Sequence, residues 1–233
     1  MCCLIFGMCF DSFSKLEAVG IITMIKHKVK QQTLYLLPEK AIFWEEKKRL
    51  IVSDLHLGKA GHFRKSGIPV SDLVHSKDIL TLEKLIKRHK PSEVILLGDL
   101  FHSEHNQGWE IFKRWLKSKA PLKFKLILGN HDVLDLSNYS IDNLEVMESL
   151  NIGPFNFTHI PEPHALYNLA GHIHPAVQLI GKARQSVKVP CYYFGELNGI
   201  LPAFGNFTGT ARITIEKTDT VFGIAENEVI KIN

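Results

Sequence analysis

Side chains that commonly bind divalent metal ions occur in five short clusters along this chain of 233 residues. Each cluster follows a short apolar run of the kind that forms a buried strand. The clusters read SDLH, GD, GNHD, FTH and GHIH. They supply seven candidate ligands: Asp54, His56, Asp99, Asn130, His159, His172 and His174. Sites in open α/β sheets gather beyond the carboxyl ends of the strands, so distant segments can deliver these side chains to one place.

The candidate ligands are carboxylate or amide oxygens and imidazole nitrogens, with no thiolate among them. This donor set suits Mn²⁺, Fe, Zn²⁺ or Mg²⁺ rather than Cu(I) or an iron–sulfur cluster. Seven candidates exceed what one ion needs and suit two ions that share a carboxylate. Two metals about 3.5–4 Å apart can hold the attacking and leaving oxygens of an in-line displacement, and can lower the pKa of bound water to about 7. A hydroxide nucleophile formed in this way needs no Ser or Cys nucleophile.

The elements that position these residues follow from the apolar patterns. Short strands are predicted at Leu50–Ser53, Val94–Leu97 and Phe124–Leu128, and helices at His75–Lys90 and Trp109–Leu116. This alternation predicts crossover connections and a mostly parallel first sheet. A hairpin is predicted from residues 33 to 44. Beyond residue 143 the strands are short and closely spaced, starting with 144–147, which indicates a second sheet.

In this order, the motifs SDLHLG, GDLF, GNHD and GHIH resemble those of the calcineurin-like metallophosphoesterases. The resemblance implies an α/β fold, a four-layer α/β/β/α sandwich of two mixed sheets flanked by helices. One metal would be bound by Asp54, His56 and His174. The other would be bound by Asn130, His159 and His172, with Asp99 bridging the two ions. His131 would hydrogen-bond the phosphoryl oxygens and could protonate the leaving oxygen, and Asp132 would orient His131.

Longer stretches from about residue 33 onward, such as SDLHLGKAGHFRKSGIPV, LLGDLFHS and LPAFGNFTG, look like the ligase-associated DNA damage response endonucleases of the PdeM type. That resemblance implies a Mn²⁺-dependent phosphodiesterase or nuclease that acts on DNA in repair. It also implies a functional association with a DNA ligase, a helicase and an exonuclease-like protein. His102 stands where many members of the wider class have Asp, and it favours this subfamily.

Four further residues are candidates for substrate binding. Lys59 and Arg64 follow the first motif and could hold a phosphate of a longer substrate, although a solvated turn would have the same composition. His102 and Asn106 lie beyond Asp99 and could line the pocket or only structure a loop. His164 competes with His159 as a ligand, but it follows Pro161-Glu162-Pro163, which is typical of a loop past the strand end.

The bulk properties set wider limits. The chain is 45% hydrophobic and 22% charged, with a formal charge of +4, so it permits a polyanionic partner without requiring one. Three of its four cysteines lie in the first nine residues, a spacing that predicts reduced thiols and a cytoplasmic protein. Residues 1–24 are interpreted as an N-terminal extension of doubtful origin, without the features of a signal peptide. Residues 25–233 are predicted to form one domain that does not enter a membrane, and the oligomeric state stays open.

Two rival functions stay open. Another branch of the same superfamily would hydrolyse phosphomonoesters, or the pyrophosphate of nucleotides or lipids, because function resides in the site and not in the fold. A catalytically silent scaffold domain is the rival outside enzymes. Such domains typically lose metal ligands, whereas every expected position is occupied in this chain.

Overall fold

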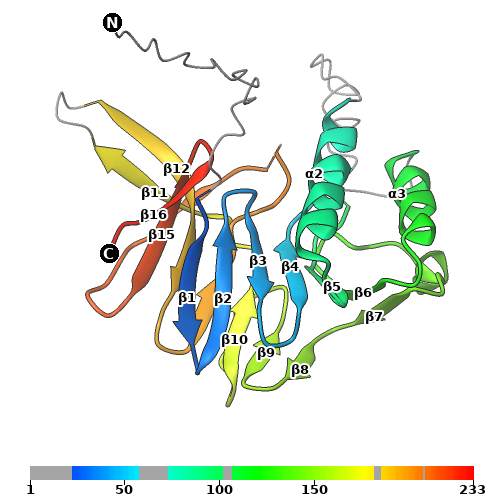
Figure 1. The fold of residues 1–233 in the computed structure, drawn as a ribbon, viewed down its shortest axis with the longest axis horizontal. Coiled ribbons are helices and arrows are strands. Elements are labelled where there is room, and N and C mark those ends of the chain that lie inside the picture. Colours follow the sequence, from blue (N-terminus) through cyan, green and yellow to red (C-terminus); the bar gives the residue numbers. More distant parts are fainter. Residues whose placement is uncertain (1–22, 58–72, 102–106, 181–184, 207) are drawn as a thin grey trace, which may run out of the picture.

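The computed structural model describes residues 23–57, 73–101, 107–180, 185–206 and 208–233 (Figure 1). The predicted substrate-binding residues Lys59, Arg64, His102 and Asn106 therefore lie outside the described residues. The first strand begins at Ile25, but the predicted boundary between extension and domain stays a prediction. Neither described α-helix is long and apolar enough to cross a membrane.

The first sheet has seven strands whose spatial order follows the chain. They are β1 (Ile25–Val29), β2 (Gln32–Leu37), β3 (Ala41–Trp44), β4 (Arg49–Ser53), β5 (Glu93–Leu97), β6 (Lys123–Ile127) and β7 (Leu144–Met147). Strands β1 to β4 pair antiparallel, and β4 to β7 pair parallel. The sheet is thus mixed rather than mostly parallel. The predicted hairpin, β2 and β3, and the strand β1 add antiparallel strands next to β4.

The second sheet contains the other nine strands. They are β8 (Leu150–Ile152), β9 (Phe155–Phe157), β10 (Tyr167–Ala170), β11 (Pro175–Ile180), β12 (Ser186–Phe194), β13 (Asn198–Ile200), β14 (Ala211–Arg212), β15 (Thr220–Ala225) and β16 (Glu228–Lys231). This sheet is also mixed, since β10 runs parallel to β9 and β13 while β12 runs antiparallel to its neighbours. The two-sheet prediction is confirmed.

Strand β7 was expected in the second sheet, and its place in the first sheet corrects that prediction. Its residues pair in parallel with β6, from Phe124 opposite Leu144 to Ile127 opposite Met147. Leu144 and Val146 pack on the helix side of the sheet, whereas Met147 packs between the sheets. Apolar contacts on both faces are typical of strands in parallel sheets, and β7 is the edge strand of this one.

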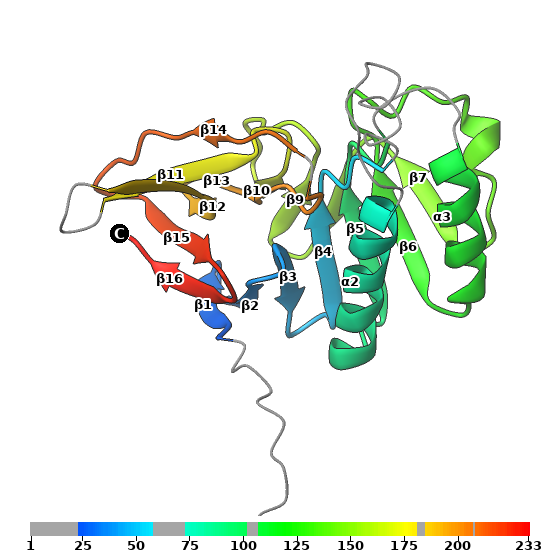
Figure 2. The same cartoon turned by 90° about the horizontal axis from the view of Figure 1, so that it is seen from above.

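Two helices, α2 (Leu73–His89) and α3 (Gln107–Ser118), cover the outer face of the β4–β7 part of the first sheet (Figures 1 and 2). From Lys123 onward the described residues contain one 3-10 turn, Leu136–Tyr139, and no α-helix. The outer helical layer over the second sheet, which the predicted four-layer sandwich includes, is therefore not seen in the described part. The predicted fold class, α/β with two mixed sheets and flanking helices, is confirmed, and both described α-helices lie on the first sheet.

Two apolar cores hold these layers together. Leu50 and Val52 of β4 face the helices, while Ile51 faces the second sheet, so β4 is buried on both sides. Between the sheets, the indole of Trp44 lies 5.0 Å from the ring of Phe155, measured between centroids. The sheets therefore have a fixed relative position, which allows turns from both sheets to build one site.

Candidate metal centre

The seven candidate ligands follow the ends of five strands that meet at one edge of the two sheets. Asp54 and His56 follow β4, Asp99 follows β5, and Asn130 follows β6. The second sheet contributes His159 after β9, and His172 and His174 after β10. Backbone hydrogen bonds join neighbouring turns, for example from His56 N to Asp99 O (2.9 Å) and from Gly171 N to His159 O (3.0 Å).

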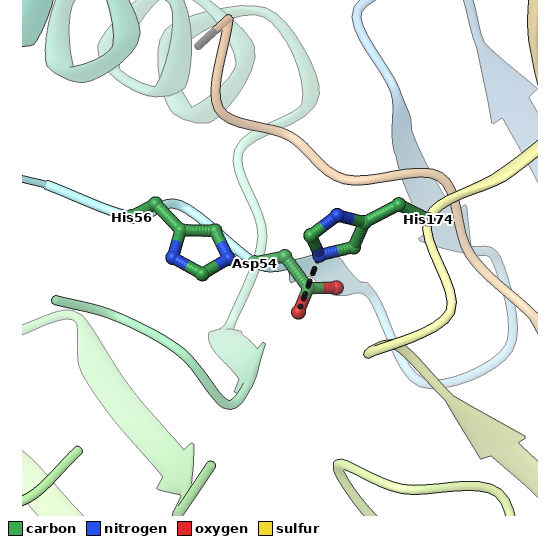
Figure 3. A group of neighbouring side chains, drawn as sticks. All are labelled: Asp54, His56 and His174. Carbon is green, nitrogen blue, oxygen red and sulfur yellow. Dashed lines mark ion pairs between the residues drawn. The ribbon is translucent and has the colours of Figure 1, made fainter. Parts of the chain in front are cut away.

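The side chains form two groups that could each hold a metal ion, with the ligand atoms of each group within 4.8 Å of one another. The first group contains Asp54, His56 and His174, whose side chains converge in Figure 3. Within it, Nε2 of His174 lies 3.2 Å from Oδ1 of Asp54. The second group contains Asp99, His159 and His172. The division matches the two ligand sets that the resemblance implies.

Asp99 lies between the two groups. Its Oδ2 is 3.6 Å from Nε2 of His56 in the first group, and its Oδ1 is 3.3 Å from Nε2 of His159 in the second. One carboxylate oxygen thus faces each group, as a bridging ligand would require. Asn130 belongs beside the second group, because its Oδ1 is 3.0 Å from Nε2 of His159.

The charge balance of the site favours cations. Asp54 and Asp99 are 0% and 2% exposed, respectively. In the part of the chain that the structure describes, neither carboxylate forms an ion pair with a Lys or Arg. Buried carboxylates that lack a cationic partner are costly unless they coordinate metal ions. Burial alone lowers the pKa of His174, but the neighbouring carboxylate of Asp54 raises it above the usual value overall.

The histidine rings present lone pairs toward the centre. Nδ1 of His159 lies 3.1 Å from the carbonyl of Leu97, and Nδ1 of His174 lies 3.1 Å from that of Gly209. A carbonyl only accepts hydrogen bonds, so Nδ1 donates and Nε2 keeps a lone pair for a metal. Nε2 of His159 is 3.1 Å from Nδ1 of His172. Two imidazole nitrogens this close together could both be ligands of one cation. The donor set therefore fits two divalent cations.

Five of the seven candidate ligands have a left-handed backbone conformation, with φ between 46° and 67°: Asp54, His56, Asp99, His172 and His174. This conformation is uncommon for residues other than glycine, and it costs on the order of 1–3 kcal/mol for each residue. Such strain persists only where the surrounding structure enforces it, and it is concentrated at functional sites. The sharp turns it produces direct the side chains into the centre.

The glycines of the GD, GN and GH motifs each support a ligand in another turn. A Cβ atom on Gly98 would overlap the ring of His159, and one on Gly129 would overlap the backbone and carboxylate of Asp99. A Cβ atom on Gly171 would lie 2.5 Å from Oδ2 of Asp54. Each turn is therefore packed against a ligand of its neighbour, and side chains at these glycines would displace that ligand.

The two predicted catalytic residues lie in the turn after β6. The N–H of His131 donates to Oδ1 of Asp99 (2.9 Å), and its ring centroid lies 5.6 Å from that of His56. The carboxylate of Asp132 accepts from the N–H groups of Leu100 and Gly129, both at 2.9 Å, so it ties two ligand turns together. Burial raises the pKa of Asp132 to about 6. That Asp132 orients His131 stays a prediction.

Other contacts settle the role of His164 and add a residue that sequence reasoning missed. His164 is exposed and its Nδ1 accepts from the N–H of Leu166 (2.9 Å), outside both ligand groups. The amide of Asn168, fully buried in β10, donates to Oδ1 of Asn156 and Oγ1 of Thr158, both at 2.8 Å. Asn168 thereby supports the segment that ends in His159. The signal in the sequence that could have identified Asn168 is its polar side chain within an otherwise apolar strand.

The comparisons with known proteins agree with this geometry. No curated protein matches the chain. The structure is similar to that of the nuclease MPE of Pseudomonas putida, with 29% sequence identity and a TM-score of 0.75. That match covers 90% of this chain and 100% of the other. The profile of the calcineurin-like phosphoesterases matches residues 47–218. With its two metal-site groups intact, the chain is a metal-dependent phosphoesterase and belongs to the calcineurin-like phosphoesterase family.

Proposed function

We propose that this protein is a binuclear metal-dependent phosphodiesterase and that it acts as a nuclease on DNA in repair. One observation carries the proposal beyond the family: the similar structure over 90% of this chain is that of a nuclease. The PdeM-type stretches support the more specific role in DNA repair. A cytoplasmic location and a functional association with a DNA ligase, a helicase and an exonuclease-like protein belong to the same proposal.

The proposed cofactors are two divalent ions, with Mn²⁺ favoured and Fe, Zn²⁺ or Mg²⁺ as alternatives. Asp54, His56 and His174 would hold one ion. Asn130, His159 and His172 would hold the other, with Asp99 shared. When bound, such a pair stabilises negative charge on phosphoryl oxygens and lowers the pKa of water. Lys59, Arg64, His102 and Asn106 are proposed to contact the rest of the substrate.

His131 is proposed to act on the substrate rather than on a metal. Its backbone N–H is fixed to the shared carboxylate of Asp99, and its ring lies beside that of His56. From this place an imidazole can hydrogen-bond a phosphoryl oxygen and deliver a proton to the leaving oxygen. Asp132, which joins the same turn to the turn after β5, is proposed to keep His131 at that position.

His131→Ala is expected to lower turnover of a diester by about 100-fold, the lower end of the range for general acid–base catalysis. Metal content should not change, because the side chain that is removed is not a ligand and the backbone hydrogen bond to Asp99 remains. Steady-state kinetics and elemental analysis of the same preparation check this. Loss of bound metal in this variant would assign His131 to the ligand set instead.

The proposed function is tested by comparing two substrates with the Mn²⁺-loaded protein, bis(p-nitrophenyl) phosphate and p-nitrophenyl phosphate. We expect cleavage of the diester in preference to the monoester, followed by cleavage of DNA oligonucleotides. Cleavage of the monoester alone would move the function to a phosphomonoesterase, and cleavage of nucleotide or lipid pyrophosphates alone would move it to a pyrophosphatase. A protein that binds no metal under any condition would be a silent scaffold.

A further inference from the structure

Residues 202–206, here called the strap, pack directly behind the Asp54 turn. The N–H of Phe204 donates to the carbonyl of Ser53 (2.8 Å), and the N–H of Gly205 donates to the carbonyl of Asp54 (3.1 Å). The hydroxyl of Ser53 donates to the carbonyl of Pro202 (3.1 Å). A Cβ atom on Gly205 would overlap the carbonyl of Leu55, so the strap and the turn are in close contact.

The chain just after the strap also supports the second histidine of the same ligand group. The carbonyl of Gly209 accepts from Nδ1 of His174 (3.1 Å). The hydroxyl of Thr208 bonds back to the carbonyl of Gly205 (2.9 Å), which links this support to the strap. Asp54 and His174 both have φ of 52°, so both ligands need surroundings that enforce a strained backbone.

The far side of the strap is held by a polar pair that the proposed chemistry does not use. The side-chain amide of Asn206 donates to Oδ1 of Asp78 in α2. Asp78 is only 3% exposed, and burial raises the pKa of its carboxyl although the hydrogen bond from Asn206 and the charges of Lys40 and Lys77 act against this. A buried carboxylate is unfavourable without strong partners, so its presence here requires an explanation. The ammonium of Lys40 adds a second tie, to the carbonyl of Gly205 (3.3 Å).

We infer that Asp78 and Asn206 are positioning residues that press the strap onto the Asp54 turn and thereby set the metal affinity of the Asp54, His56 and His174 group. The inference rests on the proposed metal centre. The two residues act through the backbone of residues 53 and 54 and through Gly209 rather than through a ligand side chain. Residues that orient metal ligands from behind typically change metal affinity by about 10- to 100-fold when they are altered.

The test exchanges the members of the pair. Asn206→Asp sets two carboxylates against each other, and we expect the Mn²⁺ affinity of one of the two sites to fall by about tenfold while that of the other is unchanged. In the double variant Asp78→Asn with Asn206→Asp, the amide at 78 can donate to the carboxylate at 206, and affinity should recover. Mn²⁺ binding is measured by electron paramagnetic resonance titration, and the Tm of the metal-free protein is measured in parallel. If Asn206→Asp does not fold, Asn206→Ser replaces it in the Mn²⁺ titration.

Ile79→Val is the matched control, because Ile79 is the next residue of α2 and packs in the helix-side core. It should lower the Tm but leave Mn²⁺ affinity unchanged. Wild-type affinity in Asn206→Asp, no recovery in the exchanged pair, or an equal loss in Ile79→Val would each overturn the inference. Wild-type protein that binds two Mn²⁺ ions but cleaves no diester would overturn the proposed function while leaving this inference standing.

Discussion

Asp99→Asn is expected to lower turnover of bis(p-nitrophenyl) phosphate by about 1000-fold or more, because a metal pair contributes several kcal/mol of charge stabilisation and each 1.36 kcal/mol is tenfold in rate. The substitution keeps the shape of the side chain but removes its negative charge. One oxygen of Asp99 faces His56 and the other faces His159, so both ligand groups lose part of their attraction for a cation at once. Steady-state kinetics with Mn²⁺-loaded protein measure the loss.

The control for Asp99→Asn is Lys117→Ala, because Lys117 is exposed on α3 and belongs to neither ligand group. This variant should keep full turnover and metal content. Elemental analysis of Asp99→Asn should show less than the wild-type amount of metal, since the shared ligand is weakened. Full activity of Asp99→Asn at wild-type metal content would remove the shared-carboxylate assignment and with it the binuclear mechanism.

The sequence was sufficient to predict which strands carry the site, because apolar runs that end in polar residues are a local pattern. Strands β4, β5 and β6 lie within one residue of their predicted bounds, and the side chains that follow them come together in the structure. What brings them together is the parallel pairing of neighbouring strands, which places their carboxyl ends at the same edge. The pairing of Asp54 with His174, which are 120 residues apart, followed only from the family resemblance.

Features that depend on tertiary packing could not be predicted. Strand β7 has the apolar character of a strand in either sheet, and only its pairing with β6 decides which sheet it joins. The left-handed conformation of Asp54 and His174 could not be predicted locally, because most Asp and His residues do not adopt it. The pair of buried Asp78 and exposed Asn206 joins positions 128 residues apart, and neither one lies in a ligand motif.

Because of this packing, substituting a glycine next to the ligands should impair the site as much as substituting a ligand. In Gly171→Ala the new Cβ would lie 2.5 Å from Oδ2 of Asp54, 2.8 Å from Cβ of Ser53 and 3.2 Å from the carbonyl of Leu97. These neighbours are backbone atoms or fully buried side chains, so the methyl group can be accommodated only by moving Asp54. The N–H of His172 donates to Asp54 at 3.0 Å, and this hydrogen bond would be disrupted as well.

We therefore expect Gly171→Ala to lower diester turnover by about 100- to 1000-fold, since a displacement of about 1 Å can cost 100-fold and ligand affinity falls with it. Overpacking should also lower the free energy of unfolding by about 1–3 kcal/mol. Gly223→Ala in β15 is the matched control, because its Cβ would approach only side-chain atoms and no ligand, the nearest being Cδ1 of Ile232 at 3.2 Å. A Gly171→Ala protein with wild-type Mn²⁺ affinity and turnover would show that the Asp54 turn adapts freely. Loss of Mn²⁺ binding in Gly171→Ala but not in Gly223→Ala would instead show that Gly171 of the GHIH motif fixes the position of Asp54, a ligand that follows another strand.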